Sequence, residues 1–467
     1  MSKIGEYIRL QIVLPLAEKA KGTCATKWLR QIERMNNWSP EQVQAWQEER
    51  LHALVEHAYN HTRYYRRIFD ELGLKPSDIR STEDLKKLPI INKEIANAHF
   101  DEIVPNNLSS FHYREGKTGG TTGEPMFYYC DEDTWGYVTA AKIYYWKHTS
   151  YRYGDAFVAM GSASLFAKKP SLVRRIYDKI RNEVPMNTVN LTDELCEKYI
   201  GIIKQKKIRF IYGYAASIYI FTKYVAAHQI DLKQIEAVFT TSEALTDEYR
   251  ELIARTYECK VVDCYGARDA GITAYETDYH YYEVGYNAIA EVANEFEPNT
   301  GTLLSTNLLN YSFPLIRYQF GDEAELEVSQ KLPTIDQQLI DQKNTGKIIS
   351  SYSSSERKPY NGQVIRRIIG RTSDVMRLEN GHNMTATGFS MIMKEFDVVA
   401  FTFNKTGVNE VTLTIQPVKG KYNETQEAEI RRTIYLYIGK DAKLHILYVE
   451  KFEASKNGKR RYFMINE

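Results

Sequence analysis

Residues 117–125 have the composition of a loop that binds an anion. They read KTGGTTGEP, and the three glycines permit the tight, partly left-handed backbone in which several N–H groups converge on one anion. The threonine hydroxyls add further donors, and Lys117 adds a positive charge beside them. The pattern indicates a loop that grips a polyphosphate; a hairpin loop that is simply rich in glycine and threonine is the alternative.

This loop is not the phosphate loop of strand–turn–helix nucleoside triphosphatases, because no Gly-Lys-Ser/Thr triplet ends a four-residue spacer after a glycine. It is followed instead by the run 126–129 (MFYY), which is typical of a strand. A strand at this position would hold the loop against a rigid edge.

Strands that alternate with helices are predicted in the middle of the chain. The strands are 209–212, 237–241 and 260–264, and the helices between them are 216–228 and 246–257. This alternation predicts a parallel sheet with right-handed crossovers, and such sheets bind ligands at the carboxyl ends of their strands. Polar residues or glycine at those ends favour a shared site over ordinary turns: Tyr212-Gly213, Ser242-Glu243 and Tyr265-Gly266.

The segment 283–322 is predicted to be antiparallel β structure. Strand 288–292 leads through the turn PNTG into strand 302–306, and a further strand, 314–318, ends close to Asp322. An aspartate behind a glycine at a strand end can accept two hydrogen bonds from a sugar diol. Taken by itself, however, the same aspartate would be an ordinary turn residue.

The regions before and just after the loop are predicted to be scaffold. Residues 26–75 carry apolar side chains at three- and four-residue steps, which is typical of helices, with Ser39 as an N-cap and a second helix start at Ser81. The aromatic stripe of a helix over 134–149 is interpreted as core packing, with cofactor stacking as the alternative.

The last hundred residues have a different character. Strands at 398–403, 411–415 and 444–449, together with a helix at 424–437, predict a small α+β domain. The basic tail, 455–461, is interpreted as solvated surface with a turn at its glycine.

Length and composition restrict the class of protein. The 467 residues leave room for two or three domains. The 61 basic and 60 acidic residues do not suggest a surface for nucleic acid or an anionic membrane. Because the five cysteines form no Cys-x-x-Cys pair, reduced cysteines in a cytoplasmic protein are expected. No apolar run approaches the roughly 20 residues that cross a bilayer.

Together these stretches resemble the adenylate-forming (acyl-CoA synthetase-like) superfamily, and in particular its branch of phenylacetate–CoA ligases and CapK-like capsular polysaccharide biosynthesis proteins. The resemblance covers nearly the whole chain and depends on the order of several motifs. They are TGGTTGEP at 118–125, YGYA at 212–215, TSEAL at 241–245, YGARD at 265–269, PLIRY at 314–318 with Gly321-Asp322, Gly370-Arg371 with Asp374, and Asn457-Gly458-Lys459.

The resemblance implies a large, multi-sheet α/β adenylation domain with parallel βαβ units, residues 1–369, and a small, mobile α+β domain, residues 370–467. It implies a two-step reaction that uses ATP and Mg²⁺. A carboxylic acid attacks the α-phosphate and gives an acyl-adenylate and pyrophosphate; an acceptor, commonly coenzyme A, then displaces AMP. The oligomeric state, homodimer included, is left open.

The resemblance also implies which residues bind the nucleotide. The β- and γ-phosphates would lie against the loop residues Thr118, Gly119, Gly120, Thr121, Thr122 and Gly123. The adenine and the α-phosphate would lie against Ser242, Glu243, Ala244, Tyr265 and Gly266. Asp322 would bind the ribose hydroxyls, and Arg371 would bind the ribose or a phosphate.

The remaining implied roles concern the chemical step. Asp269 would hold Mg²⁺, and Lys459 would approach the α-phosphate and the carboxylate when the small domain rotates. The acyl group would contact Tyr212, Gly213, Tyr214 and Ala215. Two residues depart from the family pattern: Asp269 replaces the usual glutamate, which is one methylene longer, and Ser373 occupies the usual hinge position. The cysteine cluster of some relatives is absent, so no structural zinc is expected.

Three functions are consistent with these motifs. The first is an ATP-dependent acid–CoA ligase for an aromatic or other small acid. The second keeps the adenylation step but passes the acyl group to an amine or hydroxyl acceptor in surface polysaccharide biosynthesis. The third is a catalytically silent nucleotide-binding protein.

Overall fold

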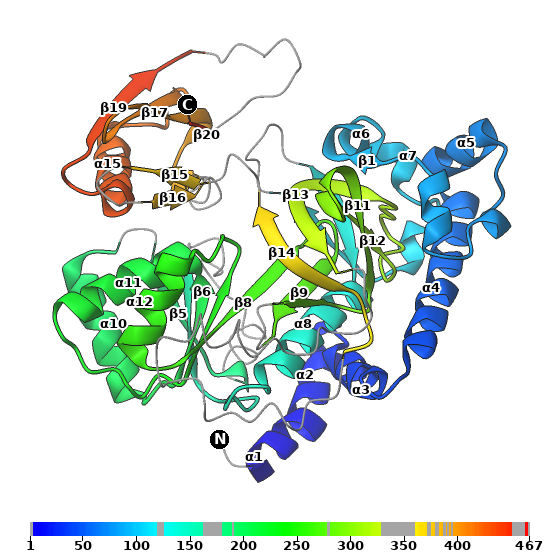
Figure 1. The fold of residues 1–467 in the computed structure, drawn as a ribbon, viewed down its shortest axis with the longest axis horizontal. Helices are drawn as coiled ribbons and strands as arrows, with labels where there is room; N and C mark the ends of the chain where they lie inside the picture. Colours follow the sequence, from blue (N-terminus) through cyan, green and yellow to red (C-terminus); the bar gives the residue numbers. More distant parts are fainter. Residues whose placement is uncertain are drawn as a thin grey trace. The chain divides into compact units, whose positions relative to one another are not determined.

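The described part of the chain forms two compact units (Figure 1). Unit 1 comprises the described residues of 1–118, 126–154 and 264–370, and unit 2 those of 155–263 and 371–467. The domain boundary expected near residue 370 remains a prediction. The computed structural model describes residues 3–118, 126–161, 180–188, 191–277, 281–327, 360–370, 375–378, 383–385, 389, 392–393, 396–450 and 463–465.

The helices of unit 1 lie largely before its sheet in the sequence. The predicted start at Ser39 is confirmed: its side chain accepts from the N–H of Gln42, and Gln42 caps the backbone of Ser39 in return. The helices are α1 (Lys3–Ile8), the π-helical turn η1 (Arg9–Val13), α2 (Leu14–Lys21), α3 (Ala25–Met35), α4 (Pro40–His61), α5 (Arg63–Leu72), α6 (Lys93–Ala98), α7 (Phe100–Ile103) and α8 (Glu132–Trp146), with 3₁₀ turns η2 (Pro76–Asp78), η3 (Glu83–Lys87) and η4 (Leu108–Ser110).

Helix α8 contains the aromatic stripe, and its largest side chains are buried. Tyr137 packs edge-on against Trp28 of α3, and Trp146 is likewise buried. The core-packing interpretation of this stripe is therefore confirmed for these two residues.

Unit 1 contains an antiparallel sheet in the order β11–β12–β13–β14–β10–β9. The end of β8, Cys264 to Ala267, pairs antiparallel with β9, and β1 pairs parallel with β13. A separate hairpin is formed by β2 and β3. The strands are β1 (Ile91–Asn92), β2 (Tyr113–Lys117), β3 (Phe127–Asp131), β8 (Lys260–Ala267), β9 (Ile272–Glu276), β10 (Tyr282–Val284), β11 (Ala288–Glu297), β12 (Thr300–Asn307), β13 (Tyr318–Leu326) and β14 (Val364–Gly370).

The strand predicted at 314–318 is wrong in its bounds, because β13 begins only at Tyr318 and continues past Asp322. Arg317 has a left-handed backbone (φ +56°), and its guanidinium is held by Glu291 at 3.1 Å and by the carbonyl of Leu88 at 2.6 Å. These contacts come from distant segments, so the local pattern did not predict them.

Gly321, at φ +97°, lies within β13 where the register against β12 shifts.

Unit 2 contains a parallel sheet in the order β7–β6–β4–β5, which confirms the predicted parallel β–α architecture. Helix α11 packs on β4, β6 and β7, and α10 and α12 flank α11 (Figure 1). The elements are β4 (Phe157–Gly161), β5 (Glu183–Asn187), α10 (Asp193–Gln205), β6 (Phe210–Tyr214), α11 (Ala215–Ala227), β7 (Ala237–Thr241) and α12 (Asp247–Tyr257).

The C-terminal segment has the predicted α+β composition. Its sheet has the order β19–β18–β17–β20, with β17 and β18 antiparallel and the outer pairs parallel. The elements are β15 (Val375–Arg377), β16 (Asn383–Thr385), β17 (Val398–Gly407), β18 (Glu410–Pro417), α15 (Glu424–Ile438), β19 (Lys443–Tyr448) and β20 (Phe463–Ile465).

Each unit has its own apolar core. Met126, Tyr65 and Tyr318 belong to the core of unit 1, while Ile211 and Phe221 belong to that of unit 2. All five cysteines are free thiols. Among the described helices, none combines the length and apolar character that a membrane crossing requires.

Candidate functional site

The two ends of the glycine-rich segment are tied together by a pair of hydrogen bonds. The N–H of Thr118 donates to the carbonyl of Met126, and the N–H of Met126 donates to Oγ1 of Thr118, each at 2.9 Å. Because β2 and β3 pair up to Lys117 and Phe127, the glycine-rich segment connects the two strands of a hairpin. The predicted strand after the loop is thus confirmed. Thr118 contributes to closing the hairpin, while the predicted phosphate ligands Gly119, Gly120, Thr121, Thr122 and Gly123 lie outside the described residues.

The hairpin is anchored by a buried pair of residues that the sequence patterns did not reveal. Asp131, at the end of β3, accepts hydrogen bonds from the N–H groups of Tyr311 at 2.6 Å and Ser312 at 3.1 Å. Its own N–H donates to Oδ1 of Asn310 at 2.9 Å. Asn310 in turn donates to the carbonyls of Tyr129 and Phe313. The hairpin is therefore held to the segment that leads into β13.

Two of the predicted nucleotide-binding residues meet within unit 1. The hydroxyl of Tyr265, near the end of β8, donates to Oδ2 of Asp322 on β13 at 2.8 Å, although the residues are 57 positions apart. Both side chains are half-buried, so the carboxylate has a fixed direction while remaining accessible. Gly266 follows directly, and a Cβ added there would approach the carbonyl of Ile272 at 3.1 Å.

The predicted metal ligand, Asp269, is also held by a tyrosine. Tyr318 donates its hydroxyl proton to Oδ2 of Asp269 at 2.9 Å. Asp269 contributes to raising the pKa of Tyr128, although burial is the larger cause. Neither tyrosine was singled out in the sequence, because their role depends on the fold.

The single carboxylate of Asp269 is compatible with a Mg²⁺ ion that arrives with a nucleotide. Across the described ranges, no cluster of three or more His, Cys, Asp or Glu could hold a metal on its own. A single carboxylate is nevertheless what Mg²⁺ commonly uses when substrate phosphates and water complete its octahedral shell.

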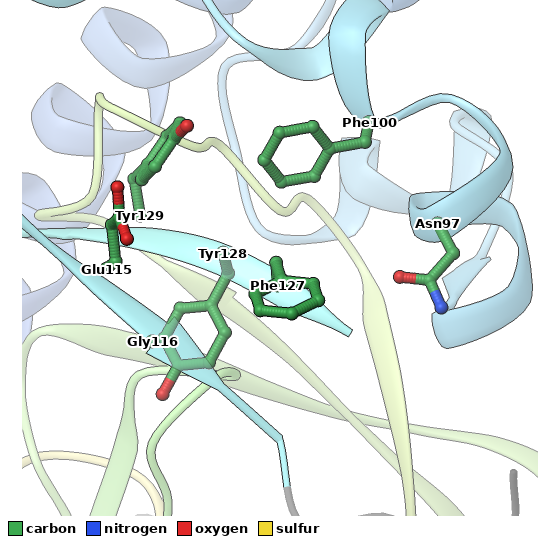
Figure 2. Close-up of a pocket in the computed structure, with 7 residues that line it drawn as sticks. All are labelled: Asn97, Phe100, Glu115, Gly116, Phe127, Tyr128 and Tyr129. Carbon is green, nitrogen blue, oxygen red and sulfur yellow. The ribbon is translucent and has the colours of Figure 1, made fainter. Parts of the chain in front are cut away.

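An open pocket of about 330 Å³ lies beside the hairpin in unit 1. Figure 2 shows the rings of Phe100 and Phe127 and the amide of Asn97 turned toward the same space, with the hydroxyl of Tyr128 directed away from them. Glu115 supplies the carboxylate of this largely aromatic lining. The run 126–129 indicated only a strand, so the pocket could not be predicted from the sequence pattern. Its lining residues are Asn97, Phe100, Glu115, Gly116, Phe127, Tyr128 and Tyr129.

In unit 2, the residues predicted to contact the acyl group lie at the end of β6 and the start of α11. Tyr212 is half-buried, whereas Tyr214 and Ala215 are buried. Gly213 is required for close packing, because a Cβ at this position would lie 2.1 Å from the carbonyl oxygen of Met160 on β4. Of these residues, Tyr212 is therefore the one with substantial exposed side chain.

The predicted adenine-binding segment has alternating exposure. Ser242 and Ala244 are exposed, and Ser242 has a left-handed backbone (φ +67°). Glu243 is buried between them, and its carboxylate accepts from the N–H of Ala216 at 2.8 Å. This contact links the segment predicted to bind adenine to the segment predicted to contact the acyl group. A second buried contact, in which Thr240 donates to Asp263 at 2.7 Å, joins the end of β7 to the middle of β8 and was not predicted from the sequence.

Burial of Glu243 raises the pKa of its carboxyl from 4.5 to about 7, which makes the stability of unit 2 depend on pH. Below pH 4.5 the group is protonated in both the folded and the unfolded chain. Between pH 4.5 and 7 only the unfolded chain releases the proton, so stability falls as pH rises. Well above pH 7, where Glu243 is ionised in the folded chain as well, its burial lowers the free energy of unfolding by roughly 3 kcal/mol relative to acidic pH.

We therefore expect the Glu243→Gln variant to be more stable than the parent protein at pH 8 and similar to it at pH 5. Glutamine retains an oxygen that can accept from Ala216 but carries no proton to lose. Urea unfolding at both pH values measures the difference; a gain of equal size at pH 5 would contradict the titration of Glu243.

Two predicted residues, Arg371 and Lys459, lie outside the described residues. Within unit 1 the fold brings together Tyr265 with Asp322, and places Asp269 beside Tyr318. Within unit 2 it brings Glu243 to the start of α11. The nucleotide, acyl and catalytic roles of all these residues remain predictions.

No family model matches the chain, but sequence relatives do. The chain is 21% identical over 429 residues to protein CapK of Staphylococcus aureus, an alignment that covers 90% of this chain and 88% of CapK. It is 25% identical over 345 residues to a phenylacetate–coenzyme A ligase of Pseudomonas putida, covering 63% and 69% of the two chains.

Solved structures share the fold. A 2-hydroxyisobutyryl-CoA ligase in complex with 2-HIB-AMP and CoA, in its thioesterification state, superposes with a TM-score of 0.57 at 17% identity, covering 91% of this chain and 90% of the ligase. The same ligase in its postadenylation state gives a TM-score of 0.53 at 17% identity over 90% and 89% of the two chains.

The sequence relatives, together with the fold shared with solved acyl-CoA ligases, support the adenylate-forming superfamily for this chain. Within that superfamily, the similarity to CapK and to phenylacetate–coenzyme A ligases supports the branch that these relatives define. The resemblance inferred from the order of the motifs is thereby confirmed, as is the α/β fold class.

Proposed function

We propose that this protein is an ATP-dependent, AMP-forming acid–CoA ligase. It activates a small or aromatic carboxylic acid as an acyl-adenylate and then transfers the acyl group to coenzyme A. The observation that carries the proposal is the hydrogen bond from Tyr265 to Asp322, because it presents a fixed carboxylate next to a residue predicted to contact the base. Relatives named as phenylacetate–coenzyme A ligases support the same reaction class.

In this proposal, Asp322 accepts hydrogen bonds from the ribose hydroxyls, and the closed hairpin presents the loop from Thr118 to Gly123 to the β- and γ-phosphates. Ser242, Ala244 and Gly266 border the base and the α-phosphate, with the buried Glu243 supporting the segment. Arg371 adds a cation at the ribose or a phosphate.

The acid attacks the α-phosphorus, and pyrophosphate leaves. The oxygens around phosphorus gain negative charge in the transition state, so cations and N–H donors that are already in place lower the barrier. Lys459 supplies the cation that approaches the α-phosphate and the carboxylate, and Asp269 is the residue that would hold Mg²⁺. When bound, that ion neutralises charge on the polyphosphate.

The acyl group of the acid lies against the segment 212–215. Tyr212 makes the contact, because its side chain is only half-buried whereas Tyr214 and Ala215 are buried. The backbone of this segment cannot shift freely, because Gly213 packs on β4 and Glu243 binds the start of α11. A rigid aromatic wall of this kind suits a planar or compact acid.

A second candidate keeps the adenylation step and changes the acceptor to an amine or hydroxyl of a surface polysaccharide precursor. The similarity to CapK, which extends over 90% of this chain, favours it. Both candidates place the enzyme in the cytoplasm, where ATP is made and thiols stay reduced. A homodimer is a further proposal that light scattering would test.

The function is tested by incubating the protein with ATP, Mg²⁺ and a panel of carboxylic acids while pyrophosphate is measured. Release that depends on one acid supports adenylation, and absence of release with every acid would favour a silent nucleotide-binding protein. Adding coenzyme A then separates the first two candidates: a thioester identifies the CoA ligase, whereas an adenylate that persists points to another acceptor.

We expect the Tyr265→Phe variant to raise the KM for ATP about tenfold, because a hydrogen bond to a charged group contributes about 1.5 kcal/mol and here orients Asp322. The effect on kcat should be smaller, since the hydroxyl does not touch the reacting atoms. Steady-state kinetics measures both constants. Tyr224→Phe is the control, because it removes a hydroxyl that binds the exposed Glu197. Equal KM values in the two variants would remove Tyr265 from the nucleotide site.

A further inference from the structure

The hydroxyl of Tyr318 lies between Met126, which closes the hairpin of β2 and β3, and the predicted metal ligand Asp269. It is 2.9 Å from Oδ2 of Asp269 and 3.6 Å from the sulfur of Met126. A hydroxyl has one proton to donate, and a carboxylate at the shorter distance is a far better acceptor than a thioether. The proton is therefore directed to Asp269, with the sulfur of Met126 packed on the other side.

The position of Tyr318 is set by its neighbours along the chain. Its side chain is 1% exposed, and its backbone pairs with Ile91 on one side and Ser305 on the other. The preceding residue, Arg317, is held by Glu291 through a buried ion pair and donates its N–H to Thr306 at 2.9 Å. A side chain constrained in this way presents its hydroxyl at one place, at little further cost in entropy.

Asp269 has a different environment. It lies in the turn after β8, between the exposed Arg268 and the buried Ala270, and its side chain is half-buried. A short carboxylate in a turn has several rotamers available, and those differ in where the oxygens point. The hydrogen bond from Tyr318 selects among them.

We infer that Tyr318 is a positioning residue that orients the carboxylate of Asp269 toward a metal–polyphosphate complex. The inference rests on the proposed function, in which Asp269 is the residue that would hold Mg²⁺. The same hydroxyl also contacts the sulfur of Met126, whose backbone closes the hairpin on Thr118. Partners that orient a metal ligand typically change metal affinity by 10- to 100-fold when removed.

The test compares ATP binding with and without metal in the Tyr318→Phe variant, which keeps the buried ring and removes the hydroxyl. Calorimetry with Mg²⁺·ATP is expected to show about tenfold weaker binding than in the parent protein. Binding of ATP in the presence of EDTA is expected to be unchanged. Equal weakening in both titrations, or no weakening in either, would overturn the role of Tyr318.

Tyr137→Phe is the matched control, because Tyr137 is equally buried and its hydroxyl accepts from the N–H of Tyr286. This variant should change neither titration. In an Asp269→Ala background, Tyr318→Phe should have no further effect on Mg²⁺·ATP binding, since the group that it orients is gone. Additive losses would contradict the inference.

These outcomes also separate the inference from the proposed function. If the parent protein binds ATP more tightly with Mg²⁺ and Tyr318→Phe retains that difference, only the inference fails. If the parent protein binds neither form of ATP, the proposed function fails and the inference fails with it.

Discussion

The Lys459→Ala variant is expected to lose acid-dependent pyrophosphate release by a factor of roughly 10²–10³ while it still binds ATP. In the proposed mechanism the ammonium group acts on charge that develops between the α-phosphate and the attacking carboxylate. Removing it raises the barrier of that step and leaves the contacts to adenine, ribose and terminal phosphates in place. Single-turnover pyrophosphate release and ATP calorimetry measure the two quantities separately.

The neighbouring Lys456→Ala variant is the control for this experiment. Lys456 belongs to the same basic tail, so its removal changes the local charge by the same amount. Adenylation should remain near the parent rate in this variant. An unchanged rate in Lys459→Ala, or equal losses in both variants, would remove Lys459 from the mechanism.

The Asp131→Ala variant is expected to lose about 3 kcal/mol of stability in unit 1. The carboxylate of Asp131 is buried and accepts from two backbone N–H groups, those of Tyr311 and Ser312. Truncation leaves both donors without an acceptor, and each unsatisfied buried group costs about 1–3 kcal/mol. Urea unfolding followed by tryptophan fluorescence measures the loss.

The same variant should weaken ATP binding, because Asp131 anchors the hairpin that presents the glycine-rich loop. Glu83→Ala serves as a control: it removes an exposed carboxylate that pairs with Lys86, and such pairs contribute less than about 1 kcal/mol. A stability of Asp131→Ala equal to that of Glu83→Ala would show that the buried anchor carries little energy.

Much of the local structure could be predicted from short stretches of sequence. The strand 237–241 has the predicted bounds, and Ser39 forms the expected N-cap. Both depend on side chains within a few residues of the element, which is the range over which periodicity and capping act. The alternative that the glycine-rich segment connects the strands of a hairpin also came from neighbouring residues, and β2 and β3 do pair in this way.

Contacts between distant segments could not be predicted in this way. The strand expected at 314–318 begins only at Tyr318. Arg317 has a left-handed backbone, and its guanidinium binds Glu291 and the carbonyl of Leu88. The anchor between Asp131 and Asn310 joins residues 179 positions apart, and each looks unremarkable in its own segment. Such partners are chosen by strand register and packing, and neither leaves a local signal.

For the candidate site, the order of the motifs in the sequence predicted the superfamily, the reaction class and the residue types that the site would need. The tertiary structure alone decided which side chains hold one another: Tyr265 with Asp322, Tyr318 with Asp269, and Glu243 with the start of α11. A motif records the chemical groups that a reaction needs. The direction in which each group points depends on side chains brought beside it by folding, which lie far away along the chain.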